Sequence, residues 1–248
     1  EMIRNIEEYH KQYKLSVNEP EKFWNDYSKQ FLWQKRSKKI LNWNFDGPEI
    51  KWFEDGKLNI TENIFERNKD KENQNAIIWE PNEPEEEGKS FTYGELFKEV
   101  CKFSNVLKKI GIKKGDRVII YLPMIPDAAI SMLACARIGA VHSVVFAGFS
   151  ANSLSDRIND CLAKAVITSD GNFRGSKTVP VKEVVDEALK NCTSVKNVLT
   201  IKRTFNKVQM KNNRDFWYHD KVKNVDDYCP PEEMNSEDLL FILYTSGS

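Results

Sequence analysis

The sequence predicts an α/β protein with a doubly wound, mostly parallel sheet that carries helices on both faces. Short runs rich in Val and Ile recur between residues 118 and 201, which is typical of strands buried on both sides. Helical patterns of about ten residues separate these runs, which indicates parallel βαβ units. An aromatic, polar stretch comes first, so we expect an irregular helical and aromatic N-terminal segment before the sheet.

The composition excludes several classes of protein. The 248 residues carry 37 basic and 37 acidic side chains, so no overall field attracts nucleic acid or an anionic membrane. No uninterrupted apolar run reaches the ~18 residues of a transmembrane helix, and the charged stretch 1–14 lacks the apolar core of a secretory signal. We therefore expect no nucleic-acid partner and no membrane partner.

Cysteine and histidine give no sign of a metal site. The five cysteines are odd in number and widely spaced, and no Cys-x-x-Cys pair occurs, which favours free thiols in a reducing compartment. The three histidines, His10, His142 and His219, lack the spacing of metal ligands. No metal-binding residue is predicted in this chain.

The first predicted region covers residues 1–73. Pro20 suits the first position of a helix that we expect to run to about Phe31. Phe23, Tyr27 and Phe31 would share one face of this helix because they are four residues apart. We interpret these rings as an anchor that packs the region against a larger body.

The second predicted region covers residues 74–248 and contains the sheet. A capping box that starts at Thr92 begins a helix, Gly111 ends that helix, and Pro126 begins the next one. The acidic stretch 80–88 is predicted to be an exposed loop, to which we assign no chemistry. The expected strands are 76–79, 118–122, 141–146, 165–168 and 195–201, and the expected helices are 92–107, 126–136, 152–161 and 181–189.

Three segments at predicted strand ends have the composition of ligand-binding loops: 146–150, 170–177 and 244–248. Ligands of doubly wound sheets bind beyond the carboxyl ends of the strands. Small residues let backbone N–H groups approach an anion, and cationic side chains add charge-assisted hydrogen bonds. The last segment follows an apolar run that is predicted to be a short buried strand. For the segments 170–177 and 244–248, an ordinary solvated turn is the alternative interpretation.

Longer motifs resemble the acetyl-CoA synthetase family of acetate–CoA ligases, within the adenylate-forming superfamily. The matching stretches extend over nearly the whole chain, at residues 52–53, 56–59, 63, 67, 113–118, 139–146, 148–150, 156–158, 216–220 and 240–248. The resemblance implies that this chain is an N-terminal part of such an enzyme. The sheet is therefore expected to be an incomplete domain.

The resemblance also implies a two-step reaction with acetate, ATP and CoA as substrates. The acid attacks the α-phosphate of ATP to give acetyl-adenylate and pyrophosphate, and the thiol of CoA then displaces AMP. By the same resemblance, the β- and γ-phosphates of ATP lie against Thr245, Ser246, Gly247 and Ser248. The CoA nucleotide lies against Arg174, Gly175, Ser176 and Lys177, with Phe146, Ala147 and Gly148 beside its adenine.

Two positions depart from the family's pattern. Lys177 stands where a second arginine is frequent, and lysine keeps the charge but loses the bidentate fork. Ala147 stands where glycine is usual, so its methyl group could narrow the approach to the backbone. The family's magnesium ligands, acid pocket and lid lysine have no counterpart up to Ser248. No catalytic residue is therefore assigned, and the chain by itself is expected to be inactive.

Two alternatives stay open. The acid could be propionate, because the residues that select the acid are not represented. The chain could also be a non-catalytic module that binds the CoA nucleotide. The resemblance implies a cytoplasmic location, and it leaves open a nuclear location and a homo-oligomer.

Overall fold

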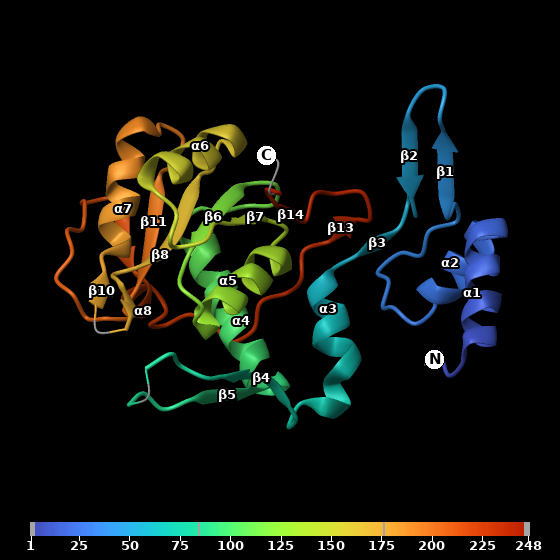
Figure 1. The fold of residues 1–248 in the computed structure, drawn as a ribbon, viewed down its shortest axis with the longest axis horizontal. Helices are drawn as coiled ribbons and strands as arrows, with labels where there is room; N and C mark the ends of the chain where they lie inside the picture. The colour runs from blue at the N-terminus through green and yellow to red at the C-terminus, as the bar shows by residue number, and fades with distance from the viewer. Residues whose placement is uncertain (1–2, 84, 176, 246–248) are drawn as a thin grey trace. The chain divides into compact units, whose positions relative to one another are not determined.

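A computed structural model describes residues 3–83, 85–175 and 177–245, and the chain divides into two compact units (Figure 1). The first unit comprises residues 1–67 and 233–238, and the second comprises residues 68–232 and 239–248. The stretch 233–238 belongs to the first unit although it lies far along the chain. Sequence patterns did not predict this connection.

The first unit is built from helices and short antiparallel strand pairs. The Asn5 side chain caps its first helix by accepting the N–H of Glu8 at 2.8 Å. Pro20 begins the second helix, as predicted, but this helix ends at Ser28, before Phe31. The elements are α1 (Ile6–Asn18), α2 (Pro20–Ser28), β1 (Leu41–Asn44), β2 (Glu49–Trp52), β3 (Lys57–Leu58), α3 (Ile60–Ile64) and β13 (Met234–Asn235); η1 (Glu66–Lys71) contains the boundary between the units.

Aromatic side chains pack against one another within the first unit. Phe23 stacks on Tyr27 with ring centroids 6.0 Å apart, so these two residues share a face as predicted, whereas Phe31 lies beyond the end of α2. Trp24 meets Trp52 of β2 edge to face, also at 6.0 Å. Such pairs add about 0.5–1.5 kcal/mol beyond the area that they bury, which helps to hold helix and hairpin together in a segment with few buried aliphatic residues.

The second unit contains a six-stranded sheet in the order β12-β11-β8-β6-β7-β14. Every neighbouring pair in this sheet is parallel, so the predicted parallel sheet is confirmed. The strands are β6 (Arg117–Tyr121), β7 (Val141–Val144), β8 (Ala165–Ser169), β11 (Asn197–Ile201), β12 (Asp215–Trp217) and β14 (Phe241–Ile242); two antiparallel hairpins are β4 (Asn75–Trp79) with β5 (Lys89–Thr92), and β9 (Asn172–Arg174) with β10 (Lys177–Val179).

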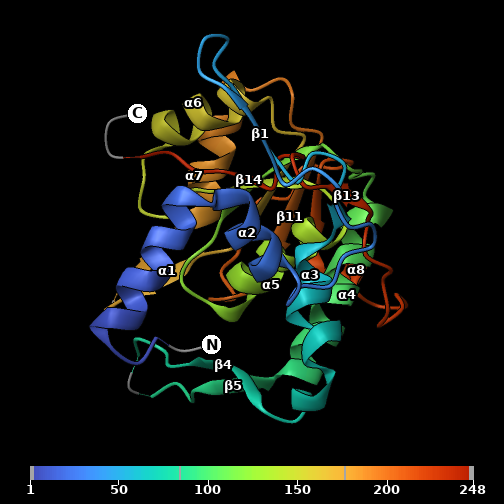
Figure 2. The same ribbon diagram turned by 90° about the vertical axis from the view of Figure 1, so that its right-hand side faces the viewer.

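Helices cover both faces of the sheet, as predicted: α4 and α5 lie on one face, and α6 and α7 lie on the other (Figure 2). The Thr92 side chain accepts the N–H of Glu95 and the Glu95 carboxylate accepts the N–H of Thr92, so the predicted capping box forms. The helical elements are α4 (Tyr93–Lys109), α5 (Pro126–Arg137), α6 (Ala151–Cys161), α7 (Val181–Ala188), η2 (Leu189–Asn191) and α8 (Tyr218–Lys221).

The core follows the alternation of side chains along the strands. Ile119 and Tyr121 of β6 belong to a fully buried cluster with Leu154 and Ile158 of α6 and Val185 of α7. The residues between them on β6 point to the α4 and α5 face. Both faces of the strand are therefore buried, which explains its continuous apolar sequence.

The two outer strands of the sheet differ from expectation. The apolar run before Tyr244 was expected to be a buried strand, but only Phe241 and Ile242 form β14, and Phe241 is 51% exposed. The expectation was wrong because, among the described residues, β14 is the outermost strand of this sheet and pairs with β7 alone. At the other edge, β12 was not predicted, since three residues carry too little pattern.

Within the described residues, no helix has the length and apolar character needed to cross a membrane.

Candidate functional site

The segments that were predicted to bind ligands follow the carboxyl ends of parallel strands. Phe146 follows β7, the β9–β10 hairpin follows β8, and Thr245 follows β14. Since all six strands run in the same direction, their carboxyl ends share one edge of the sheet, where open α/β sheets bind ligands. Ser176, Ser246, Gly247 and Ser248 lie outside the described residues.

The stretch that was expected to be a glycine-containing loop is a hairpin. Its two strands pair with Arg174 directly opposite Lys177, so only Gly175 and Ser176 connect them. Gly175 has φ +54°, a conformation that two-residue hairpin turns demand and that glycine adopts without strain. Sequence reasoning missed the hairpin because each strand has only three residues.

Two cations face each other at the end of this hairpin. Directly opposed residues of an antiparallel pair project from the same face, with Cβ atoms about 4.5–5.5 Å apart, and like charges there destabilise the pair. Arg174 and Lys177 are both exposed. Among the described residues, no carboxylate forms a salt bridge with either of them. An anion held between the guanidinium and the ammonium would remove this repulsion.

A second group of predicted residues lies in the turn after β7. The Phe146 ring is 66% exposed and meets the Phe149 ring edge to face at 5.8 Å. A Cβ atom at Gly148 would lie 2.4 Å from the Phe146 ring, so glycine lets this ring fold over the backbone. Ala147 is partly buried and packs against the core cluster. Its methyl group therefore points towards the core and does not narrow the outer surface of the turn.

Arg157 of α6 connects this turn to the residue before Thr245. Its guanidinium lies 5.0 Å from the centroid of the Phe149 ring and 4.8 Å from that of the Tyr244 ring. The Tyr244 hydroxyl donates to the Asp160 carboxylate. Burial, together with this hydrogen bond, raises the pKa of Tyr244 to about 12. Tyr244 is thus a neutral hydrogen-bond donor that anchors the end of β14 to α6.

Of the predicted ATP segment only Thr245 is described, and the strand that leads to it lies apart in the sheet from the strand that leads to the predicted CoA hairpin. Strands β6 and β7 separate β8, which leads to the hairpin, from β14, which leads to Thr245. Three steps of about 4.8 Å put the two strands roughly 14 Å apart. The turn at Phe146 follows the strand next to β14, so it stands between them.

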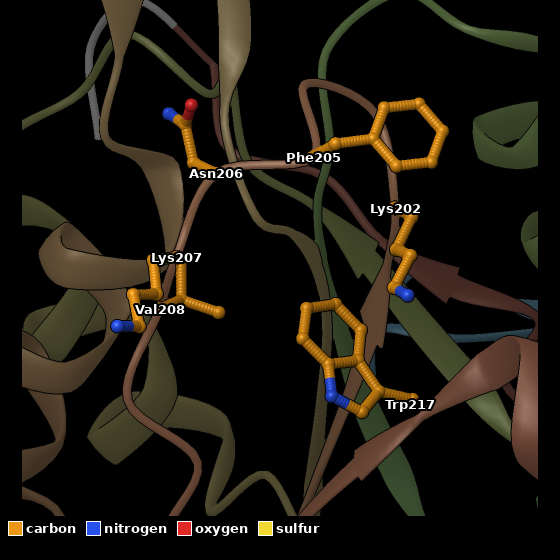
Figure 3. Close-up of a pocket in the computed structure, with 6 residues that line it drawn as sticks. All are labelled: Lys202, Phe205, Asn206, Lys207, Val208 and Trp217. Atoms are coloured by element: carbon orange, nitrogen blue, oxygen red, sulfur yellow. The ribbon is translucent and has the colours of Figure 1, made fainter.

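A pocket of about 310 Å³ at the ends of β11 and β12 was not predicted (Figure 3). The Lys202 ammonium lies over the Trp217 indole at 5.3 Å from its centroid, and the Phe205 ring points away from the opening. The lining residues are Lys202, Phe205, Asn206, Lys207, Val208 and Trp217. The residues come from two segments separated in sequence, so no local pattern could have revealed it.

The structure offers few groups for direct acid–base or metal chemistry. Among the described residues, no three His, Cys, Asp or Glu side chains gather to hold a metal ion. His142 is buried on β7, and burial lowers its pKa to about 4, so it is neutral and inaccessible. The five cysteines are free thiols, as predicted, and burial raises the pKa of Cys135 to about 12.

Known proteins resemble this chain in sequence. A model of the AMP-binding enzyme family matches residues 64–248, and a model of the acetyl-coenzyme A synthetase N-terminus matches residues 9–64. Acetyl-coenzyme A synthetases from Parvibaculum lavamentivorans and Mesorhizobium japonicum are 52% and 51% identical over 99% and 97% of this chain. The chain spans 38% of the length of each relative.

A solved structure supports the fold. Acetoacetyl-CoA synthetase from Streptomyces lividans superimposes with a TM-score of 0.85, covering 94% of this chain and 35% of its own, at 24% identity. At that identity the likeness concerns the fold only. The sequence matches extend over both units of the structure and over the carboxyl edge of the sheet. By these matches, the chain belongs to the AMP-binding enzyme family, with an N-terminal region of the acetyl-coenzyme A synthetase type.

Proposed function

We propose that the complete protein carrying this chain is an ATP-dependent acetate–CoA ligase. It converts acetate and ATP to acetyl-adenylate and pyrophosphate, and then transfers the acetyl group to the thiol of CoA with release of AMP. The identity of 50–52% to acetyl-coenzyme A synthetases supports this proposal. The structural observation that carries it is the opposed pair of Arg174 and Lys177 at the carboxyl edge of the sheet.

In this proposal the hairpin binds a phosphate group of the CoA nucleotide. The Arg174 guanidinium can donate two parallel hydrogen bonds to phosphate oxygens, and the Lys177 ammonium adds a compact charge. Gly175, with its positive φ, follows Arg174 in the turn, and Ser176 belongs to the proposed contact but lies outside the described residues. At the turn after β7, the exposed Phe146 ring gives the adenine an apolar surface, and the backbone of Ala147 and Gly148 lies beside the adenine.

The segment after β14 binds the β- and γ-phosphates of ATP. Thr245, Ser246, Gly247 and Ser248 offer hydroxyl and backbone N–H donors where negative charge moves onto the leaving pyrophosphate, and fixed donors there stabilise the transition state. Magnesium accompanies ATP in such reactions. The described residues hold no cluster that fits a metal ion, so no step is derived through one. We place the enzyme in the cytoplasm.

The test is Arg174→Ala in the complete protein. Loss of a charge-assisted contact is worth about 1.5–3 kcal/mol, so the KM for CoA should rise about ten- to a hundredfold. Acetate-dependent exchange of pyrophosphate into ATP, which reports the first step, should stay nearly unchanged. Lys108→Ala, at the exposed end of α4, is the control. An unchanged KM for CoA in the Arg174 variant would refute the assignment of the hairpin.

A further inference from the structure

Arg203 joins three parts of the second unit just after β11. Its guanidinium lies 4.9 Å from the centroid of the Phe173 ring on β9 and 5.4 Å from that of the Trp79 ring on β4. It also donates two hydrogen bonds to the Glu86 carboxylate. The Arg203 side chain is only 13% exposed and that of Glu86 is 24% exposed. A planar cation between two rings, with a bidentate carboxylate at its edge, has one defined orientation.

The partners of Arg203 are themselves fixed. The Trp79 indole donates to the carbonyl oxygen of Met124 at 2.8 Å, beyond the end of β6. The hydrogen bonds from Arg203 hold the pKa of Glu86 below its usual range, so this carboxylate stays ionised at neutral pH. Glu86 belongs to the acidic loop between β4 and β5, for which the sequence suggested no chemistry. In the structure, Glu86 of this loop contacts Arg203, which also contacts Trp79. These three side chains form a clamp.

The backbone at Arg203 is attached to the base of the same hairpin. The buried Asp170 carboxylate accepts the N–H groups of Gly171 at 2.8 Å, Arg203 at 2.7 Å and Thr204 at 3.0 Å. A Cβ atom at Gly171 would lie 2.5 Å from the Thr204 hydroxyl oxygen, so the two segments are in close contact. The position of Arg203 relative to the hairpin is therefore set at the backbone as well as at the side chain.

The two faces of the hairpin carry different side chains and make different contacts. Successive side chains of a strand point to opposite faces, so Phe173 and Thr178 share one face, and Arg174 and Lys177 share the other. The first face contacts the Arg203 guanidinium. The second carries the opposed cations. A two-stranded hairpin of this size is at best marginally stable by itself, and the opposed charges weaken it further. It needs support from the face away from the ligand.

We propose that Arg203 is a positioning residue for CoA: with Trp79 and Glu86 it holds the face of the hairpin that carries Phe173, so that Arg174 and Lys177 on the other face are aligned for phosphate. The inference rests on the proposed function, since it assumes that this hairpin binds the CoA nucleotide. In the described part of the chain, Arg203 contacts the hairpin and not residues 243–245 after β14, so its removal should impair CoA binding and spare the ATP-dependent first step.

The experiment compares variants of the complete protein in both half-reactions. Arg203→Lys keeps the charge but loses the planar fork and its stacking. The KM for CoA should rise about three- to thirtyfold, the range of a lost desolvated cation–π contact. The KM for ATP in acetate-dependent pyrophosphate exchange should stay within about twofold. Glu86→Gln keeps the shape of the side chain and should also raise the KM for CoA, by a smaller factor. This variant replaces Arg203→Lys as the test if Arg203→Lys does not fold.

Controls separate this role from a general loss of structure. Arg117→Lys is the matched control, because it makes the same change of side chain at the opposite, amino edge of the sheet. There Arg117 donates to two carbonyl oxygens. The KM of the Arg117→Lys variant for CoA should stay unchanged. In the double variant of Arg203 and Glu86, the effects should be less than additive, because both changes break the same clamp.

The Arg174→Ala variant separates a failure of the positioning role of Arg203 from a failure of the proposed function of the hairpin. A raised KM for CoA in Arg174→Ala, together with unchanged values in the Arg203 and Glu86 variants, overturns the positioning role and leaves the proposed function intact. Equal losses in both half-reactions of those variants also overturn it, because they indicate a structural defect. If Arg174→Ala itself leaves the KM for CoA unchanged, the CoA assignment of the hairpin fails, and the positioning role fails with it.

Discussion

His142 shows how burial changes the chemistry of a single residue. It lies on β7 opposite Phe241 of β14, with ring centroids 5.8 Å apart, and 6% of it is exposed. Burial penalises the charged imidazolium and lowers the pKa to about 4 from 6.5. The residue contributes an uncharged ring to the contact between the last two strands of the sheet, and its charged form would disrupt that contact.

The stability of the protein should therefore depend on His142 below neutral pH. Above pH 6.5 the folded and unfolded states are both neutral at this residue. As the pH falls from 6.5 to about 4, the unfolded state binds a proton that the folded state excludes, so the free energy of unfolding decreases by up to about 3 kcal/mol. Urea unfolding of the complete protein at pH 7 and pH 4.5 measures this change. His142→Phe should lose less stability over the same interval, and equal losses would contradict the explanation.

At the scale of an element, α7 depends on a group of four charged side chains, of which Lys182 and Asp215 are fully buried. The Lys182 ammonium donates to Asp186 at 2.8 Å and to Asp215 of β12 at 2.9 Å, and its side chain is fully buried. Arg214 donates to the same two carboxylates. Lys182 also donates to the carbonyl oxygen of Gln209 at 3.1 Å. The group ties α7 to the edge strand and to the segment between β11 and β12.

Removing one member should destabilise this part of the fold strongly. Lys182→Met leaves two carboxylates that share a single cation, and breaking such a buried group costs about 3–5 kcal/mol. The exposed pair of Lys190 and Glu187 lies next to it in the chain, and Lys190→Met should change the free energy of unfolding by less than about 1 kcal/mol. Urea unfolding of both variants makes the comparison. A Lys182 variant as stable as the Lys190 variant would show that the buried charges add nothing.

At the scale of the whole molecule, the charges balance overall but not locally. Lys and Arg equal Asp and Glu in number, yet one edge of the sheet carries the opposed cations of the hairpin, and the pocket beside β12 adds Lys202 and Lys207. Net charge therefore gives no attraction for anions, and any attraction must come from such local groups of cations. The described residues on this edge include exposed cations, and no three His, Cys, Asp or Glu side chains among the described residues gather to hold a metal ion.

A protein consisting of residues 1–248 should therefore be inactive by itself. The chain spans 38% of the length of its acetyl-coenzyme A synthetase relatives, and its proposed contacts are to phosphates and to the CoA nucleotide only. Mixed with acetate, ATP and magnesium, it should release no pyrophosphate above background. The complete protein is the positive control. Turnover by a clean preparation of residues 1–248 would show that the chain holds catalytic groups that the structure does not reveal.

Local sequence determined much of this protein. The continuous apolar strand at 118–122, the capping box at Thr92 and the helix start at Pro126 all formed as predicted, because each depends on residues within one or two turns of chain. The loops at the strand ends could likewise be predicted as ligand-binding candidates, since parallel strands always bring their carboxyl ends to one edge.

Other features depended on tertiary structure. The opposition of Arg174 and Lys177 required the pairing of β9 with β10, and the inward direction of Ala147 required the core beneath it. The clamp on Arg203 joins residues more than a hundred positions apart, and the joining of 233–238 to the first unit spans a similar distance. The physical reason is that local patterns report backbone preferences, whereas the partner of a charged or aromatic side chain is chosen by whichever segments the folded chain brings within contact distance.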